Sequence, residues 1–106
     1  MKIKSNRLRR ILTDIFKKHN LNSSHSLICA DALINAELVG APTHGLSRLK
    51  MYCDRINKKV INPKPKIKIK KISQSITHID ANNSIGFVAG DIGIMQAIKN
   101  AKSTGI

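Results

Sequence analysis

The first half of the chain carries apolar residues at the spacing of α-helices. Five of them occupy one helical face, at positions i, i+3, i+4, i+7 and i+8, and predict an amphipathic helix over residues 5–19: Leu8, Ile11, Leu12, Ile15 and Phe16. Asn20 is a suitable end for this helix, because asparagine tolerates the left-handed conformation.

A second helix is predicted over residues 24–39, with an N-cap supplied by the Asn22–Ser24 segment. Its apolar residues spread around much of the circumference, so we expect it to be packed from several directions. The Gly40-Ala41-Pro42 sequence ends this pattern. Thr43 can then cap a third helix, which we expect over residues 44–57.

The second half of the chain begins with an extended connector at residues 62–65. Alternating lysine and isoleucine over residues 66–70 predicts a half-buried strand whose lysines suit a sheet edge. A second strand is expected at residues 76–80, a turn at Asn82-Asn83 and a last helix over residues 91–103. The predicted class is therefore α+β, as one domain over residues 1–106. Two strands make a marginal sheet, so we expect the N-terminal part of a larger fold.

The chain is strongly basic, with 19 Lys and Arg against 6 Asp and Glu in 106 residues and a formal net charge of +13. Such a charge favours a nucleic-acid or anionic-membrane partner if it gathers in a patch. Ile, Lys and Asn, which have AT-rich codons, make up 40 of the 106 residues, so genome composition is the simpler explanation. We expect no membrane span and no secretory signal. Two cysteines without a ligand pattern indicate a reduced, cytoplasmic protein without zinc.

The segment with the most chemical content is Thr43–Tyr52. On a continuous helix, His44, Arg48 and Tyr52 would form one ridge, with the apolar Leu46, Leu49, Cys53 and Ile56 on another face. A guanidinium binds a carboxylate through paired hydrogen bonds, and an imidazole or phenol donates to a substrate oxygen. With Thr43 at the helix N-terminus, these residues suit a small 2-oxo or 2-hydroxy acid. The alternative is an ordinary solvated helix face.

The Gly40–Leu49 segment together with Tyr52 resembles the N-terminal signature of the malate/L-lactate dehydrogenase family, which includes ureidoglycolate, sulfolactate and diketogulonate oxidoreductases. A second match is the Ile79–Gly86 segment, followed by Ala97, Ala101 and Gly105-Ile106. Thr43 stands where this family usually has serine, a change that keeps the hydroxyl.

The resemblance implies a non-Rossmann fold that uses NAD or NADP, forms dimers, and places Thr43, His44, Arg48 and Tyr52 in the substrate pocket. A family subunit is roughly three times longer, more than one ordinary domain. The later His and Lys credited with proton transfer have no counterpart here, and neither does most of the nucleotide surface. We therefore expect the N-terminal, substrate-side portion of an NAD(P)-dependent oxidoreductase acting on the CH–OH group of a small 2-hydroxy acid. We expect the cofactor domain to be absent from this chain and the chain to be inactive alone.

Two other functions stay open. The helices on either side of residues 40–43 can imitate a helix-turn-helix that presents Arg48 and Lys50 to nucleic acid, although the positive charges are scattered along the chain. The exposed strand at residues 66–70 and the last helix suit an interaction module. It would pair with a full-length paralogue, with another copy as a homodimer, or with a complementing second half.

Overall fold

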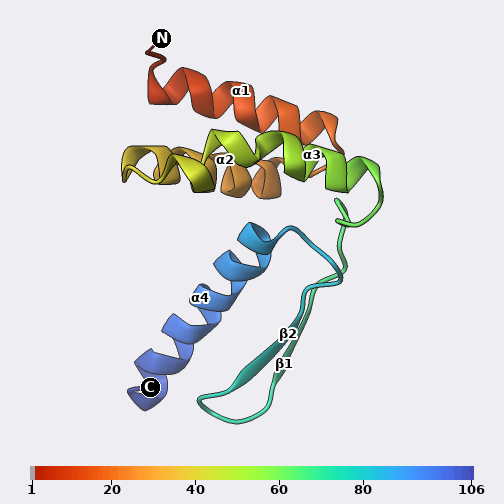
Figure 1. Ribbon diagram of the computed structural model, residues 1–106. Helices are drawn as coiled ribbons and strands as arrows, with labels where there is room; N and C mark the ends of the chain where they lie inside the picture. Colours follow the sequence, from red (N-terminus) through yellow and green to blue (C-terminus); the bar gives the residue numbers. More distant parts are fainter. Residues whose placement is uncertain (1) are drawn as a thin grey trace.

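The computed structural model describes residues 2–106 and has four α-helices, a two-stranded sheet and two short 3₁₀ turns. The order of three helices, two strands and one helix is confirmed (Figure 1). The elements are α1 (Ser5–Lys18), α2 (Ser23–Leu38), the turns Pro42–His44 and Leu46–Arg48, α3 (Leu49–Asn57), β1 (Lys68–Lys71), β2 (Thr77–Asp80) and α4 (Gly86–Thr104).

Helices α1 and α2 form a hairpin whose ends follow the predicted local signals. Asn20 has a φ of 72°, the left-handed conformation expected at the end of α1. The Asn22 side chain caps α2 by accepting a hydrogen bond of 2.7 Å from the His25 backbone N–H. An ion pair between Arg9 and Asp31 joins the two helices at their surface. Both helices therefore begin and end within one residue of the prediction.

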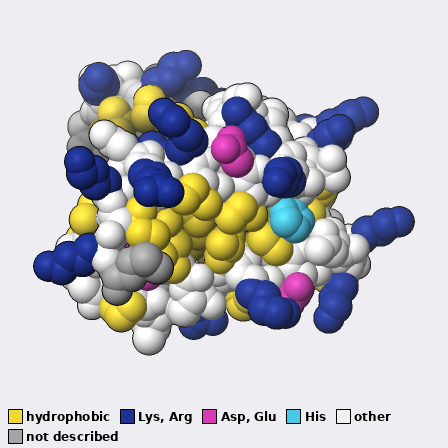
Figure 2. Space-filling view, turned by 90° about the horizontal axis from the view of Figure 1, so that it is seen from above, with side chains coloured by type: hydrophobic (Ala, Val, Ile, Leu, Met, Phe, Trp, Pro, Cys, Tyr) yellow, Lys and Arg dark blue, Asp and Glu magenta, His cyan; other side chains and the backbone are white. Residues whose placement is uncertain are grey.

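The outer side of α1 keeps some apolar side chains in contact with solvent. Ile11, which the periodicity placed on the same face as Leu12 and Phe16, is instead 41% exposed. It lines a shallow hollow together with Ile3, Lys2, Lys4 and Arg7. Figure 2, which looks down on the molecule from the α1 side, shows a band of hydrophobic side chains flanked by lysine and arginine. Basic residues thus border this face and do not cover it.

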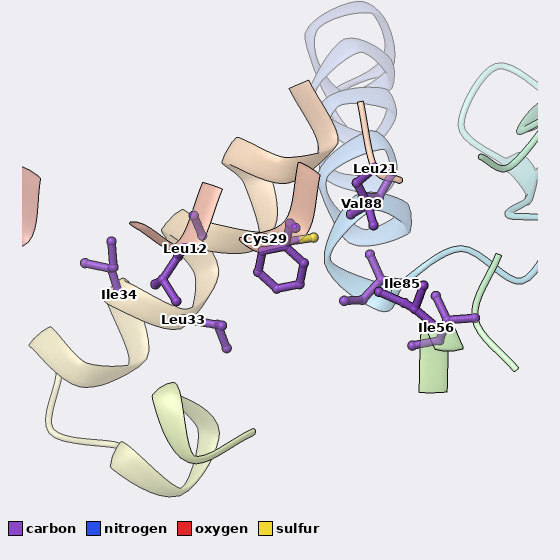
Figure 3. Close-up of a cluster of buried hydrophobic side chains, with 11 residues drawn as sticks. Leu12, Leu21, Cys29, Leu33, Ile34, Ile56, Ile85 and Val88 are labelled. Carbon is purple, nitrogen blue, oxygen red and sulfur yellow. The ribbon is translucent and has the colours of Figure 1, made fainter. Parts of the chain in front are cut away.

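The core lies between α1 and α2 and extends to α3 and the start of α4 (Figure 3). Phe16 and Leu12 on the inner face of α1 are 0% and 1% exposed, as the helical periodicity predicted. Cys29 and Leu33 of α2 are fully buried beside them. Other buried members are Leu21, Ala30, Ile34, Ile56, Ile61, Ile85 and Val88.

Strands β1 and β2 pair antiparallel, with Ile69 opposite Ile79 and Lys70 opposite His78. The strand type is confirmed, but the half-buried pattern predicted for residues 66–70 is wrong for Ile69, which is 50% exposed. Helix α4 packs on β2, where Ile79 lies next to Gly93. A two-stranded ribbon has too few neighbours to bury the β1 isoleucine as well.

Helix α4 begins at Gly86, five residues before the predicted start at Asp91. Asn82 and Asn83 both adopt positive φ, so the chain completes its turn early. Ile85 and Val88 are then buried, and their packing offsets the low helix propensity of Gly86 and Gly90.

The molecule is more extended than a compact domain of its length. Its radius of gyration is 15.3 Å, against about 13 Å for a typical 100-residue domain. Figure 1 shows the reason: α4 and the β1–β2 ribbon extend together away from the layer formed by α1, α2 and α3. In residues 2–106, no helix combines the length and the hydropathy needed to cross a membrane.

Candidate functional site

The segment between α2 and α3 does not continue as one helix, and the predicted helix over residues 44–57 is wrong in its first five residues. Pro42–His44 and Leu46–Arg48 form separate 3₁₀ turns, and α3 begins at Leu49. Gly45 lies between the turns with backbone angles of φ −99° and ψ −133°, which are neither helical nor extended. The Leu46 N–H donates to Glu37 Oε1 at 2.8 Å and so is held by α2. His44, Arg48 and Tyr52 therefore do not share a helical ridge.

The two turns nevertheless bring three of the predicted site residues together. Arg48 Nε donates to the Thr43 carbonyl oxygen at 2.7 Å. Thr43 Oγ1 lies 3.1 Å from His44 Nδ1. All three residues are exposed. The Thr43 hydroxyl thus lies at the imidazole of His44, and the Arg48 guanidinium lies at the Thr43 backbone, through turn geometry, whereas the sequence argument relied on helical periodicity. We call these three residues the turn cluster.

The Tyr52 side chain is not part of the turn cluster. It lies in α3 and packs edge-on against Phe87 of α4, with ring centroids 5.3 Å apart and an interplanar angle of 64°. The ring is half-buried against the hydrophobic core, where it connects α3 to the start of α4. Its place among the substrate-binding residues stays a prediction.

Glu37 and Gly45 support the turn cluster, and the sequence analysis missed both. Gly45 is buried, and a Cβ placed on it would lie 2.8 Å from Glu37 Cδ. Only a glycine therefore allows the Glu37 carboxylate to approach the backbone and accept from Leu46. A signal was present: Glu37 is an acid in the last turn of a helix, where the macrodipole disfavours negative charge.

Hydrogen bonds within the turn cluster leave part of its chemistry available. The Thr43 contact occupies His44 Nδ1, so Nε2 is the ring nitrogen that can meet a ligand. Arg48 uses Nε on the Thr43 carbonyl, and Nη1 also lies 4.0 Å from Met51 Sδ. The Nη2 donors can still bind a carboxylate. All three residues are exposed to solvent in this structure.

Hydrogen bonding and burial explain the shifted pKa values near the turn cluster and at the two cysteines. Lys50 donates to Asp54 Oδ2 at 2.6 Å, and this hydrogen bond lowers the pKa of Asp54 and raises that of Lys50. Burial raises the pKa of the Cys29 thiol to about 12 and also raises that of Cys53. Neither cysteine is therefore activated as a nucleophile. Residues 2–106 hold no group of three His, Cys, Asp or Glu side chains arranged for a metal ion.

The sequence profile of one protein family, malate/L-lactate dehydrogenase, matches residues 3–106. The chain belongs to the malate/L-lactate dehydrogenase family. The resemblance inferred from the Gly40–Leu49 and Ile79–Gly86 segments is thereby confirmed.

Curated relatives in this family are dehydrogenases. The chain is 34% identical over its whole length to the L-sulfolactate dehydrogenase of Methanocaldococcus jannaschii, and it covers 31% of that protein. It is also 34% identical to the malate dehydrogenase of Pyrococcus horikoshii, covering 29%, and 28% identical to the NAD⁺ ureidoglycolate dehydrogenase of Escherichia coli K12, covering 30%. The chain thus spans about 30% of the length of these relatives.

Solved structures give the same match. The P. horikoshii malate dehydrogenase superposes with a TM-score of 0.94 at 33% identity, over 99% of this chain and 30% of that one. The M. jannaschii sulfolactate dehydrogenase superposes with a TM-score of 0.91 at 34% identity, over 96% of this chain and 30% of that one. The expected fold, an N-terminal portion of the family's subunit, is confirmed.

Proposed function

We propose that this chain is the substrate-side portion of an NAD(P)-dependent oxidoreductase acting on the CH–OH group of a small 2-hydroxy acid. The observation that carries the proposal is the turn cluster of Thr43, His44 and Arg48, held by direct hydrogen bonds in a chain of this dehydrogenase family. Malate, sulfolactate and ureidoglycolate, the compounds in the relatives' names, all carry a hydroxyl on the carbon next to a carboxylate.

Each residue of the turn cluster has a role suited to such a molecule. The Nη2 donors of Arg48 bind the carboxylate, and the contact of Nε with the Thr43 carbonyl fixes the direction of the guanidinium. His44 Nε2 donates to, or accepts from, the hydroxyl oxygen of the substrate. Thr43 orients the imidazole through Nδ1. We place Tyr52 at the border of the pocket, where its half-buried ring connects the turn region to α4.

A nicotinamide dinucleotide needs more surface than this part of the fold provides. The chain spans about 30% of the length of its dehydrogenase relatives, and in residues 2–106 the sheet has two antiparallel strands. These residues alone do not fit the cofactor, so we propose that the isolated chain is inactive. We retain NAD or NADP as the cofactor, a cytoplasmic location and a homodimer as predictions from the sequence.

The first test is turnover by the isolated chain with malate, lactate and sulfolactate, each with NAD and NADP. We expect none. Turnover at ordinary enzyme rates of ~1–10³ per second would contradict the proposed incompleteness.

The second test uses a hybrid subunit, in which this chain replaces the matched 31% of the M. jannaschii L-sulfolactate dehydrogenase. Arg48→Ala removes a charged hydrogen bond worth about 1.5–3 kcal/mol, so we expect kcat/KM for sulfolactate to fall roughly 10–100-fold. Lys50→Ala removes the same charge two residues away and is the matched control. Equal kcat/KM for the two variants would contradict the role of Arg48.

A further inference from the structure

We infer that the outer face of the β1–β2 ribbon binds double-stranded DNA through its phosphate groups, without a sequence preference. The segment that includes this ribbon carries most of the net charge. Residues 55–79 hold eight Lys and Arg and no Asp or Glu, in a chain with a formal net charge of +13. Residues 14–54 and 80–106 each hold equal numbers of acidic and basic residues. A bias toward AT-rich codons raises lysine along the whole chain, so it does not explain this concentration.

The lysines of the segment alternate along the strand and lie on one face of the ribbon. In the antiparallel register, Lys68 lies opposite Asp80 and Lys70 lies opposite His78. Residues that are directly opposite, or two apart on one strand, share a face of a sheet, so these four form the outer face. The lysines of residues 64–71 are all exposed: Lys64, Lys66, Lys68, Lys70 and Lys71.

Helix α4 occupies the opposite face of the ribbon. Ile79 lies next to Gly93 of α4, and Asn100 of α4 donates a hydrogen bond of 3.1 Å to Thr77 Oγ1. In Figure 1, α4 lies on one side of the ribbon, and no other helix or strand of residues 2–106 lies across the other side. The lysine face is therefore open, and the helix supports it from behind.

Asparagine side chains hold the start of the lysine row in place. Asn62 Oδ1 accepts from the Lys64 N–H at 3.0 Å, and Asn82 Oδ1 accepts from the Lys66 N–H at 3.0 Å. Asn62 Nδ2 also donates to Asn82 Oδ1 at 3.0 Å, which joins the connector to the turn after β2. The backbone of the row is thus ordered before a ligand arrives, and less conformational entropy is lost on binding.

The lysine charges are not neutralised within the molecule. In the described part of the chain, one ion pair joins α1 to α2 and another lies within α3, and neither includes a ribbon lysine. Asp80 is the acid on the outer face, and its Oδ1 accepts from the Asn82 N–H instead. Protection of a sheet edge needs only a few charges and no absence of acids, so it does not account for this row.

The row matches a linear polyanion with a regular repeat. Alternate residues of a strand lie about 6.6–6.8 Å apart, and each DNA strand carries one phosphate per about 3.4 Å of helix axis. The major groove of B-form DNA admits a two-stranded β-ribbon, whereas that of an RNA duplex is too narrow. Residues 66–80 contain no Phe, Tyr or Trp on which single-stranded bases could stack. Double-stranded DNA is therefore the partner.

The helices on either side of residues 40–43 are a poorer surface for DNA. Arg48 Nε donates to the Thr43 carbonyl oxygen, and Lys50 Nζ donates to Asp54 Oδ2. Both charged groups that a helix-turn-helix would present are thus engaged within the molecule, in contrast to the ribbon lysines.

The inference does not rest on the proposed function, and its test needs no activity. Fluorescence anisotropy measures binding of the 106-residue chain to a labelled DNA duplex of about 20 base pairs. We expect a Kd of about 10⁻⁴–10⁻⁶ M near physiological salt. Between about 50 and 200 mM NaCl, log K should fall against log[NaCl] with a slope of about −3 to −4.5, because about three to five phosphates are neutralised.

Substitutions on the ribbon test the location of the site. Lys66→Gln/Lys68→Gln/Lys70→Gln should weaken binding at least about tenfold and reduce the steepness of the salt dependence by about 3. The corresponding triple Lys→Arg variant keeps the charge and should bind as the unaltered chain does. Asp80→Asn removes the acid of the same face and should tighten binding about twofold or more. Circular dichroism of each variant checks that it is folded.

The matched control removes three exposed lysines from the ends of α1: Lys4→Gln/Lys17→Gln/Lys18→Gln. It lowers the net charge by the same amount and should weaken binding less than about threefold. Equal weakening in the two Gln variants would overturn the inference, since net charge alone would then explain the binding. So would no binding at about 50 mM NaCl, or tighter binding to an RNA duplex or to phosphatidylserine vesicles than to DNA. None of these results bears on the turn cluster, so the proposed function is tested separately.

Discussion

From the contact between Glu37 and Gly45 we predict how much stability is lost when either residue is replaced. Replacing Gly45 by alanine would place a methyl group where the Glu37 carboxylate lies, since the three atoms nearest to the added Cβ all belong to Glu37. The carboxylate would have to withdraw and would lose its 2.8 Å hydrogen bond from the Leu46 N–H. Hydrogen bonds to charged groups are worth about 1.5–3 kcal/mol, and partial exposure reduces this one to about 1–2 kcal/mol.

The same interaction can be removed from the other side. Glu37→Ala deletes the acceptor but also removes a negative charge from the last turn of α2, which returns about 0.3–1 kcal/mol. We therefore expect a net loss of about 1 kcal/mol for this variant. In the Glu37→Ala background, Gly45→Ala should cost almost nothing, because the group that the methyl displaces is gone.

A double-mutant cycle measured by urea unfolding, with helical circular dichroism as the signal, gives the coupling directly. We expect a coupling energy of about 1–2 kcal/mol between the two positions, and a Tm lowered by about 4–8 °C per kcal/mol in the single variants. Asp14→Asn, on the exposed side of α1, is the control and should leave the stability unchanged. If Gly45→Ala costs the same in both backgrounds, the argument that glycine is needed for the approach of Glu37 is refuted.

Two further predictions concern the core. Phe16→Ala, at a side chain that is 0% exposed, should lower the free energy of unfolding by about 3–5 kcal/mol; Ile69→Ala on the exposed strand should have a much smaller effect in the same urea titration, and similar losses would contradict the assignment of the core. Burial raises the pKa of Cys29 to about 12, so at pH 9 iodoacetamide should label Cys53 alone until urea unfolds the chain. Because the folded state holds the Cys29 proton more tightly, this thiol's contribution to stability is complete below its unfolded pKa and is lost as pH rises toward about 12. Rapid labelling of both thiols without urea would show that Cys29 is accessible.

Local sequence signals predicted the elements whose ends are decided locally. The period of apolar residues placed α1 and α2, and Asn20 and Asn22 marked the turn between them, because a left-handed residue and a side-chain cap act within three residues of their own position. The alternation of lysine and isoleucine likewise predicted strand β1, since its period of two is a property of the backbone.

Elements that depend on distant contacts were predicted less well. The helix over residues 44–57 was wrong at its start because Glu37, nine residues before Leu46, holds the Leu46 N–H. Helix α4 began early because Ile85 and Val88 enter the core formed by α1 and α2. In the first case the contact with α2 fixes a non-helical backbone at Gly45, and in the second the packing overrides the low helix propensity of Gly86 and Gly90.

The candidate site shows the same division. The family, the residue types and the segment followed from the sequence alone, since Thr43, His44 and Arg48 lie in a six-residue stretch inside the Gly40–Leu49 signature. The tertiary structure decided that two 3₁₀ turns, and not a helical face, bring these three residues together, and that Tyr52 packs against Phe87. Residue identity and short-range spacing are written in the chain, whereas the direction of a side chain depends on which distant backbone and side-chain groups are packed against it.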